Sequence, residues 1–206
     1  VDPVEVPNIN ALGADEFTVL LYEFKHDIAS YLAHANVPSK SLADLIAFNQ
    51  AHADRELPWF GQELFEQAQA KGPLTDKAYL DALARMKQRA GPEGIDAALK
   101  SHQLDALLAP SWGPAFPTDP LLGDHVVSGD PTIGGVSQIA AVAGYPSITV
   151  PATMAHGLPV GIVFMGAKWS EPTLIAIAYG FEQASHARQP PRFLPTLVTT
   201  RPQPAH

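Results

Sequence analysis

The sequence contains no cysteine among its 206 residues. This absence excludes disulfide bonds, thiolate metal sites and cysteine nucleophiles within the chain. It fits a protein of the cytosol or of the periplasm equally well, so the compartment stays open. No apolar run approaches the ~20 residues that a membrane-spanning helix requires. We therefore expect a soluble protein that does not act in a membrane.

Basic residues are also few, since 13 Lys and Arg stand against 21 Asp and Glu and give a formal charge of -8. They are spread along the chain and form no stripe of the kind that neutralises phosphates. A nucleic-acid partner is therefore not expected.

Metal ligands and catalytic side chains form no recognisable motif. No two of the 8 histidines have the i, i+4 spacing of a zinc-binding helix, so neither a metal nor a cofactor is expected. Ser128, His125 and Asp130 could be assembled into a triad, but three residues of one loop do not easily fix one another's geometry. The segment "GDPTIGG" at 129–135 lacks the Lys-Ser/Thr ending of a phosphate-binding loop.

The first half of the chain has the apolar periodicity of helices. Residues 14–103 are predicted to be mainly helical, because apolar side chains recur there at spacings of three and four. Ser39 or Ser41 is the candidate N-cap of a second helix. The helix that starts near residue 75 is expected to break at "AGPEG", 90–94, where proline interrupts the pattern.

The second half changes to short, nearly uncharged, β-forming segments. We interpret residues 104–188 as a sheet-forming α/β region of the same domain and the proline-rich residues 189–206 as an extended tail. The run "LDALLAP", 104–110, predicts a buried strand. The Gly- and Pro-rich segment that follows predicts a long loop, and "VSQIAAVAG" predicts a small-residue helix.

Two further strands are predicted at residues 147–150 and 160–165. The nine residues between them, "PATMAHGLP", cannot hold the dozen or more that a parallel crossover needs. The two strands are therefore expected to be antiparallel neighbours in one sheet.

Four blocks of the second half, in their order and spacing, resemble the C-terminal part of the amidase signature family: "DALLAPSWGPAFPTD", "SQIAAVAGYPSITVPA", "GLPVGIVFMG" and "EPTLIAIAYGFEQAS". The helical segments of the first half are similar to those that precede this region in bacterial amidases and peptide-amidase-like members. The resemblance implies an α/β fold present only in part, with a mixed sheet that has helices on both faces and a helical N-terminal region.

The family hydrolyses carboxamides with a Ser-Ser-Lys arrangement, in which a lysine relays a proton through one serine to activate the other. Both serines, the lysine and the Gly/Ser-rich oxyanion motif belong to the family's N-terminal half. The chain has no match to any of them, and none of its seven lysines has a matching context. No catalytic residue is therefore carried over, and the chain alone is expected to be inactive.

The resemblance does imply substrate-pocket residues. In this family the loop after the "LLAP" strand and the start of the helix before "AGYP" face the active site. The matching positions are Ser111, Trp112, Gly113, Ser137 and Gln138. Trp112 fits an apolar pocket wall, although a tryptophan that caps the core is an alternative.

The expected partners are the N-terminal catalytic half of the amidase domain and a small-molecule amide substrate. Strands that normally border the other half would leave apolar edges exposed, so self-association of the chain is also expected. Two alternatives stay open from the sequence. One is a non-catalytic structural or binding module derived from the amidase fold, and the other is a complete hydrolase with an unrecognised site.

Overall fold

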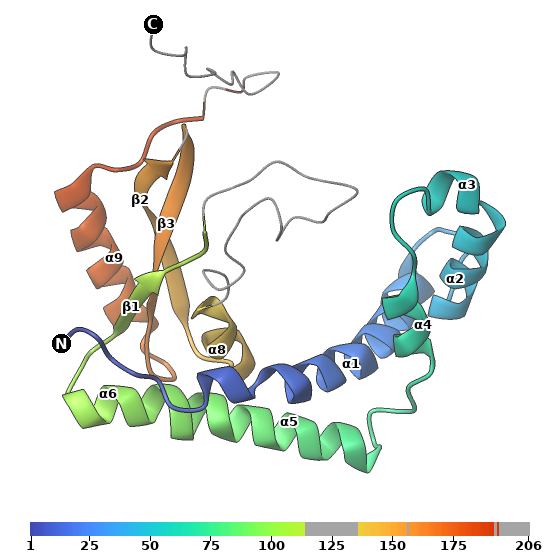
Figure 1. Cartoon of the computed structure of the whole chain (residues 1–206), viewed down its shortest axis with the longest axis horizontal. Coiled ribbons are helices and arrows are strands. Elements are labelled where there is room, and N and C mark those ends of the chain that lie inside the picture. The colour runs from blue at the N-terminus through green and yellow to red at the C-terminus, as the bar shows by residue number, and fades with distance from the viewer. Residues whose placement is uncertain (114–135, 156, 192, 194–206) are drawn as a thin grey trace, which may run out of the picture.

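Helices and one small sheet make up the described part of the chain. The computed structural model describes residues 1–113, 136–155, 157–191 and 193. The elements are η1 (Ile9–Ala11), α1 (Gly13–His34), α2 (Leu42–Ala51), α3 (Ala53–Glu56), α4 (Glu63–Gln69), α5 (Lys77–Ala90), η2 (Gly91–Ile95), α6 (Asp96–His102), β1 (Leu107–Pro110), α8 (Val136–Ala143), β2 (Ser147–Ala155), β3 (Leu158–Met165) and α9 (Glu171–Ser185). Figure 1 shows α1 lying along α5, with α2–α4 at one end of this pair and the sheet at the other.

Helix α2 begins where the sequence placed its cap. The Ser41 side chain accepts a hydrogen bond from the backbone N–H of Asp44, at 3.2 Å. The Asp44 carboxylate in turn accepts one from the backbone N–H of Lys40, at 2.8 Å. The two side chains satisfy donors at the helix start that would otherwise lack partners, as in a capping box.

The predicted break at Gly91-Pro92 is wrong, because the helix continues through it. Helix α5 passes at Ala90 into the π-helix η2, which leads directly into α6. A π-turn is wider than an α-turn and accommodates a proline that lacks an N–H. Gly91 lies against the ring of Tyr145, where an added Cβ would come within 3.1 Å of the phenol.

The sheet has three strands in the order β1-β3-β2. The prediction that the last two strands pair antiparallel in one sheet is confirmed, since Ser147 is opposite Met165 and Val150 is opposite Ile162. Both strands are longer than predicted and leave only residues 156 and 157 between them. Gly157 has a φ of 79°, a conformation that favours glycine and suits a tight hairpin.

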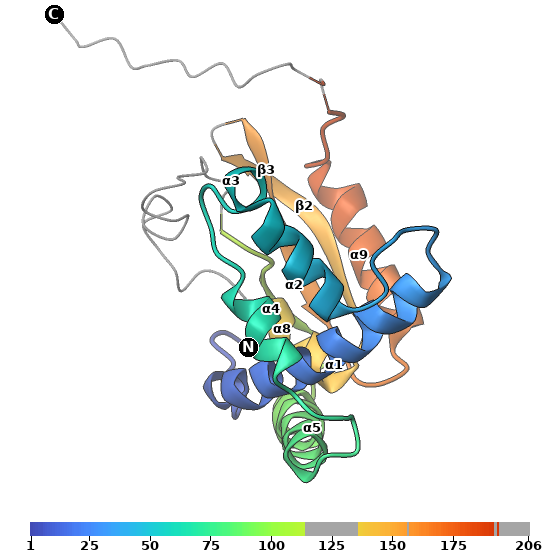
Figure 2. The same ribbon diagram turned by 90° about the vertical axis from the view of Figure 1, so that its right-hand side faces the viewer.

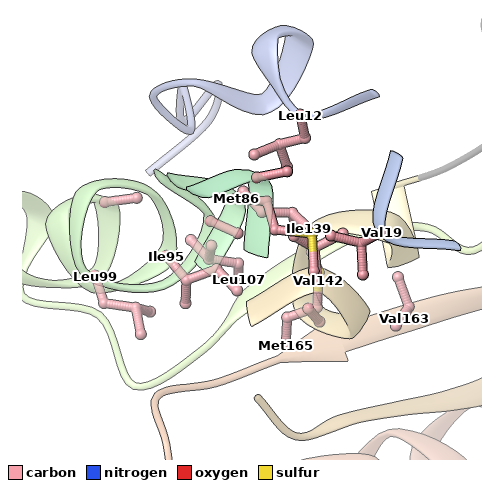
Figure 3. Close-up of a cluster of buried hydrophobic side chains, with 14 of the residues drawn as sticks. Leu12, Val19, Met86, Ile95, Leu99, Leu107, Ile139, Val142, Val163 and Met165 are labelled. Atoms are coloured by element: carbon pink, nitrogen blue, oxygen red, sulfur yellow. The ribbon is translucent and has the colours of Figure 1, made fainter. Parts of the chain in front are cut away.

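Helices pack on both faces of the sheet, as the resemblance implies. In β3, Val163 and Met165 point toward α8 (Figure 3), whereas Ile162 and Phe164 contribute to the cluster beneath α9. Figure 2 shows α9 running alongside β2 and β3. The expected mixed sheet needs a correction, because every strand pairing among the described residues is antiparallel.

The strand β1 is shorter and less buried than the sequence predicted. It spans Leu107–Pro110 rather than 104–110, and the side chain of Leu108 is 60% exposed. The cause is its position at the sheet edge, since α9 packs mainly on β2 and β3. Leu107 points to the other face and is buried.

The buried apolar residues form one large cluster and two small ones. The central core joins α1, α5, η2, α6 and α8 to β1 and β3, with Leu12, Ile95, Ile139 and Val163 almost fully buried (Figure 3). The α9 core consists of Val150, Phe164, Leu174 and Ala178. The arm core joins α1 to α2 and α4, which with α3 form what we term the helical arm, through Leu21, Leu42 and Ala68.

Candidate functional site

The first predicted wall segment, Ser111–Gly113, directly continues β1. The backbone N–H of Ser111 donates to the carbonyl of Gly161 at 3.0 Å, which extends the β1–β3 pairing by one residue. The backbone of Ser111 is therefore fixed by the sheet. This pairing places the side chain of Ser111 next to Gly161 of β3.

Gly161 is the residue that allows this placement. A Cβ built on it would lie 2.8 Å from Ser111 Oγ and 2.7 Å from Thr149 Cγ2, closer than real Cβ contacts come. Any side chain at position 161 would force the side chains of Ser111 and Thr149, or the strand backbone, to shift. The site reasoning from the sequence missed Gly161, although a glycine inside a strand pattern signals a close approach of another group.

Trp112 is 55% exposed. A tryptophan that caps a core loses most of its accessible surface, so Trp112 does not cap the core formed by the described residues. An aromatic side chain held next to a fixed strand end can instead offer an apolar face to a bound molecule. Gly113 follows it and is partly buried.

The second predicted wall segment, Ser137 and Gln138, lies in the first turn of α8. Ile139 and Ala140, the next two residues, are fully buried in the central core and anchor this turn. Nothing further is described for the Ser137 side chain. Gln138 is partly buried, and its Nε2 donates a hydrogen bond to Oε2 of Glu16.

Glu16 comes from the first turn of α1, far away in sequence. Its neighbour Asp15 fixes this turn on α5, because it accepts hydrogen bonds from Arg85 Nη2 at 2.6 Å and from Arg85 Nε at 3.1 Å. The bond from Arg85 is the main cause that lowers the pKa of Asp15 below its ordinary value of 3.8. The sequence analysis did not find Glu16, since only the fold brings it to Gln138.

The two wall segments start from one core but are not joined by a described contact. Ala109, just before the first segment, packs against the cluster that contains Ile139, just after the second. The residues between the segments, 114–135, lie outside the described part of the chain. The rejected alternatives, Ser128, His125, Asp130 and "GDPTIGG", lie there as well, so the structure does not address them.

Two lysines that could have served as bases hold helix ends instead. Lys25 Nζ donates to the carbonyls of Gln69, at 2.8 Å, and of Lys71. Lys40 Nζ donates to the carbonyls of Ala35, at 2.7 Å, and of Leu32. Cations at these positions satisfy carbonyl groups at the ends of helices.

A surface hollow of about 600 Å³ lies on α1 and is lined by Asp27, Ser30, Tyr31, His34 and Ala35. All five residues belong to or follow one helix, and none is a predicted wall residue. Among the described residues, no group of three or more His, Asp or Glu side chains could hold a metal ion. No helix there is both long and apolar enough to cross a membrane.

Comparison with known proteins identifies a family that the chain matches. Residues 1–175 match the family described as Amidase. A probable amidase of Arabidopsis thaliana is 35% identical over 202 residues, an alignment that covers 94% of the chain and 35% of the relative. The chain thus spans about a third of that relative's length.

Solved structures agree with the sequence match. The peptide amidase of Stenotrophomonas maltophilia is 51% identical and superposes with a TM-score of 0.81 over 92% of the chain and 37% of the amidase. The peptide amidase PAM, solved with the competitive inhibitor chymostatin, is 52% identical with a TM-score of 0.83, over 92% of the chain and 38% of that protein. The family match over residues 1–175 and the similarity to the peptide amidases show that the chain belongs to the amidase signature family.

Proposed function

We propose that the chain is the C-terminal part of an amide hydrolase, in which it supplies sheet core and one wall of the substrate pocket. The observation that carries this proposal is the alignment itself. At 52% identity, 92% of the chain accounts for only 38% of the peptide amidase PAM. The catalytic Ser-Ser-Lys set, which belongs to the family's N-terminal half, would come from the remainder.

Exposed apolar side chains support the need for another part of the fold. The described chain exposes several large ones on α1 and the helical arm: Phe17, Leu20, Phe24, Phe48, Trp59, Phe60 and Leu64. Both β1 and β2 are also edge strands with backbone groups that can pair further. Surfaces of this kind are covered in stable proteins, so the N-terminal part of the amidase fold is the proposed occupant.

The wall residues would contribute binding rather than bond chemistry. Amide hydrolysis by serine requires a nucleophile, a proton relay and oxyanion donors, which act as a unit. Trp112 would present an apolar surface, while Ser111 and Gln138 would offer polar anchors. The substrate would be an amide, and the likeness to peptide amidases favours an amide carried by a peptide.

A chimera tests the proposal directly. The segment of the S. maltophilia peptide amidase that matches this chain is replaced by the complete 206-residue chain, and hydrolysis of a peptide amide is measured. We expect turnover by the chimera and none above background by the chain alone. A chimera that folds but does not turn over contradicts the proposal and favours a non-catalytic module.

The opposite result is equally informative. Turnover by the chain alone, abolished by substituting one of its own serines, would show that it contains a complete active site. The chain alone is also expected to self-associate through its exposed apolar surfaces. A stable monomer in light scattering at high concentration, without binding of an apolar dye, contradicts this expectation.

A further inference from the structure

We infer that Glu16 is a positioning residue, which orients the amide of Gln138 so that its Oε1 accepts a hydrogen bond from the N–H of the substrate amide. The inference rests on the proposed function, because it takes Gln138 as part of the pocket wall. It adds a residue from α1 to that wall and gives Gln138 a defined chemical role.

The pair is held by two separate parts of the fold. Gln138 lies in the first turn of α8, which the buried residues Ile139 and Ala140 anchor in the central core. Glu16 sits in the first turn of α1, where its backbone N–H donates to the carbonyl of Leu12 at 3.0 Å. A carboxylate is favoured in this position by the helix dipole. The side-chain bond between them is partly buried and joins positions 122 residues apart.

The chemistry of the two groups fixes which way the amide points. An ionised carboxylate only accepts hydrogen bonds, so Glu16 must receive one of the N–H groups of Gln138. The carbonyl oxygen Oε1 of Gln138 is bonded to the same carbon as Nε2 and therefore points away from Glu16. No described residue donates to Oε1, which leaves an acceptor directed away from the pair.

Glu16, and not Asp15, has the charge available for this task. Asp15 is engaged by Arg85 and also lies 3.5 Å from Arg89 Nη1. Glu16 forms no ion pair among the described residues, and the side-chain donor that the structure gives it is Gln138 Nε2. Hydrogen bonds to a charged acceptor are roughly twice as strong as those between neutral groups. The orientation of Gln138 is thus well determined.

An acceptor at this position distinguishes amides from esters. A carboxamide substrate carries N–H donors on its leaving nitrogen, whereas the matching ester has none. A buried acceptor that finds no donor costs binding free energy, so a correctly oriented Oε1 favours the amide. If Glu16 is lost, the Gln138 amide can turn its NH₂ group toward the pocket and the preference decreases.

The pairing itself is tested first, on the complete 206-residue chain by NMR. The side-chain NH₂ signals of Gln138 are assigned by their absence in Gln138→Leu. We expect one proton to be shifted downfield and protected from exchange, and expect both effects to disappear in Glu16→Ala. The exposed pair of Gln88 and Glu93, 3.1 Å apart, offers a matched control in Glu93→Gln. Gln138 signals that are unchanged by Glu16→Ala overturn the inference.

The substrate contact is tested in the chimera with a peptide amide and the methyl ester of the same peptide. Glu16→Ala removes one oriented hydrogen bond, which is expected to raise KM for the amide about tenfold. KM for the ester should change about twofold or less. Glu16→Gln, which can still accept from Gln138, should lie between wild type and Glu16→Ala. Glu93→Gln should leave both substrates unchanged.

The outcomes separate this inference from the proposed function. Equal losses for amide and ester mean that Glu16 has only a structural role, which overturns the inference while the proposed function stands. A folded wild-type chimera that hydrolyses neither substrate overturns the proposed function, and the inference fails with it.

Discussion

The central core and the helical arm differ in how much of their apolar surface the described chain itself covers. The central core connects helices from the first half to strands from the second and buries Leu12, Ile95 and Ile139 completely. The arm core buries Leu42 and Ala68 of the helical arm against Leu21 of α1, while Phe48, Trp59 and Phe60 stay exposed. The described chain thus covers most of the central core itself, whereas it leaves several large apolar side chains of the helical arm exposed.

The prediction with the largest expected effect compares one side chain shortened to alanine in each region. Ile139 is 0% exposed in the central core, and Ile139→Ala should lower the free energy of unfolding by about 2–5 kcal/mol, because it leaves a cavity. Leu64, in the helical arm, is 58% exposed, and Leu64→Ala should change the free energy of unfolding by no more than about 0.5 kcal/mol. Urea unfolding of both variants measures the two values. Equal losses would mean that the arm is packed as firmly as the core.

A smaller effect is expected at Gly161, where the sheet supports the candidate wall. Gly161→Ala places a methyl group against Thr149 and Ser111, and we expect it to destabilise the chain by about 1–3 kcal/mol through overpacking. Gly180, on α9, is a matched control, because nothing lies within 4 Å of its added Cβ. Gly180→Ala should be neutral or slightly stabilising, since alanine is the better helix former. A neutral Gly161→Ala would contradict the close approach of Ser111.

A still smaller effect is expected where the helices of the central core meet β2. Tyr145 donates to the Asp96 carboxylate at 2.7 Å, and burial together with this bond raises the pKa of Tyr145 to about 12. Tyr145→Phe keeps the ring against Gly91 but removes the donor, which should cost about 1 kcal/mol. Spectroscopic titration of the phenol provides the second measurement. A phenol that titrates near its ordinary pKa of 10.0 contradicts the buried bond.

How far the sequence predicts these regions depends on the range of the contacts involved. Local patterns sufficed for α1, for the Ser41 cap and for the antiparallel hairpin, because each depends on neighbouring residues or on the length of one connection. The sequence did not predict the π-turn at Gly91, where the chain lies against the distant ring of Tyr145. The exposed Leu108 was missed because the order of strands in the sheet is not a local property.

The candidate site shows the same limit. The resemblance placed Ser111 and Gln138 in two separate segments, but it could not name the residues beneath or beside them. Gly161 and Glu16 become visible only when strand pairing and helix packing bring them to their partners. Motifs thus sufficed to name candidate wall positions, whereas the residues that contact them could be named only from the fold.

The smallest effect compares two carboxylates that start helices, Asp15 beside the central core and Asp44 in the helical arm. The pKa of each lies below its ordinary value of 3.8, Asp15 mainly through Arg85 and Asp44 mainly through the backbone N–H of Lys40. A lowered pKa in the folded state means that the ionised group favours folding. This contribution is complete above about pH 4, the range of an unfolded aspartate, and is lost as the pH falls through the folded value.

Salt distinguishes the two causes. The ion pair of Asp15 with Arg85 is partly exposed, so Asp15→Asn should cost less than about 1 kcal/mol at neutral pH and still less at high ionic strength. The cap of Asp44 uses uncharged partners, so the effect of Asp44→Asn should be nearly independent of salt. The difference in the free energy of unfolding between wild type and each of the two variants should shrink at pH 3. If the destabilisation by Asp15→Asn does not depend on salt, Arg85 does not hold this end of α1 through its charge. If the destabilisation by Asp44→Asn does depend on salt, the arm depends on a cation outside its cap.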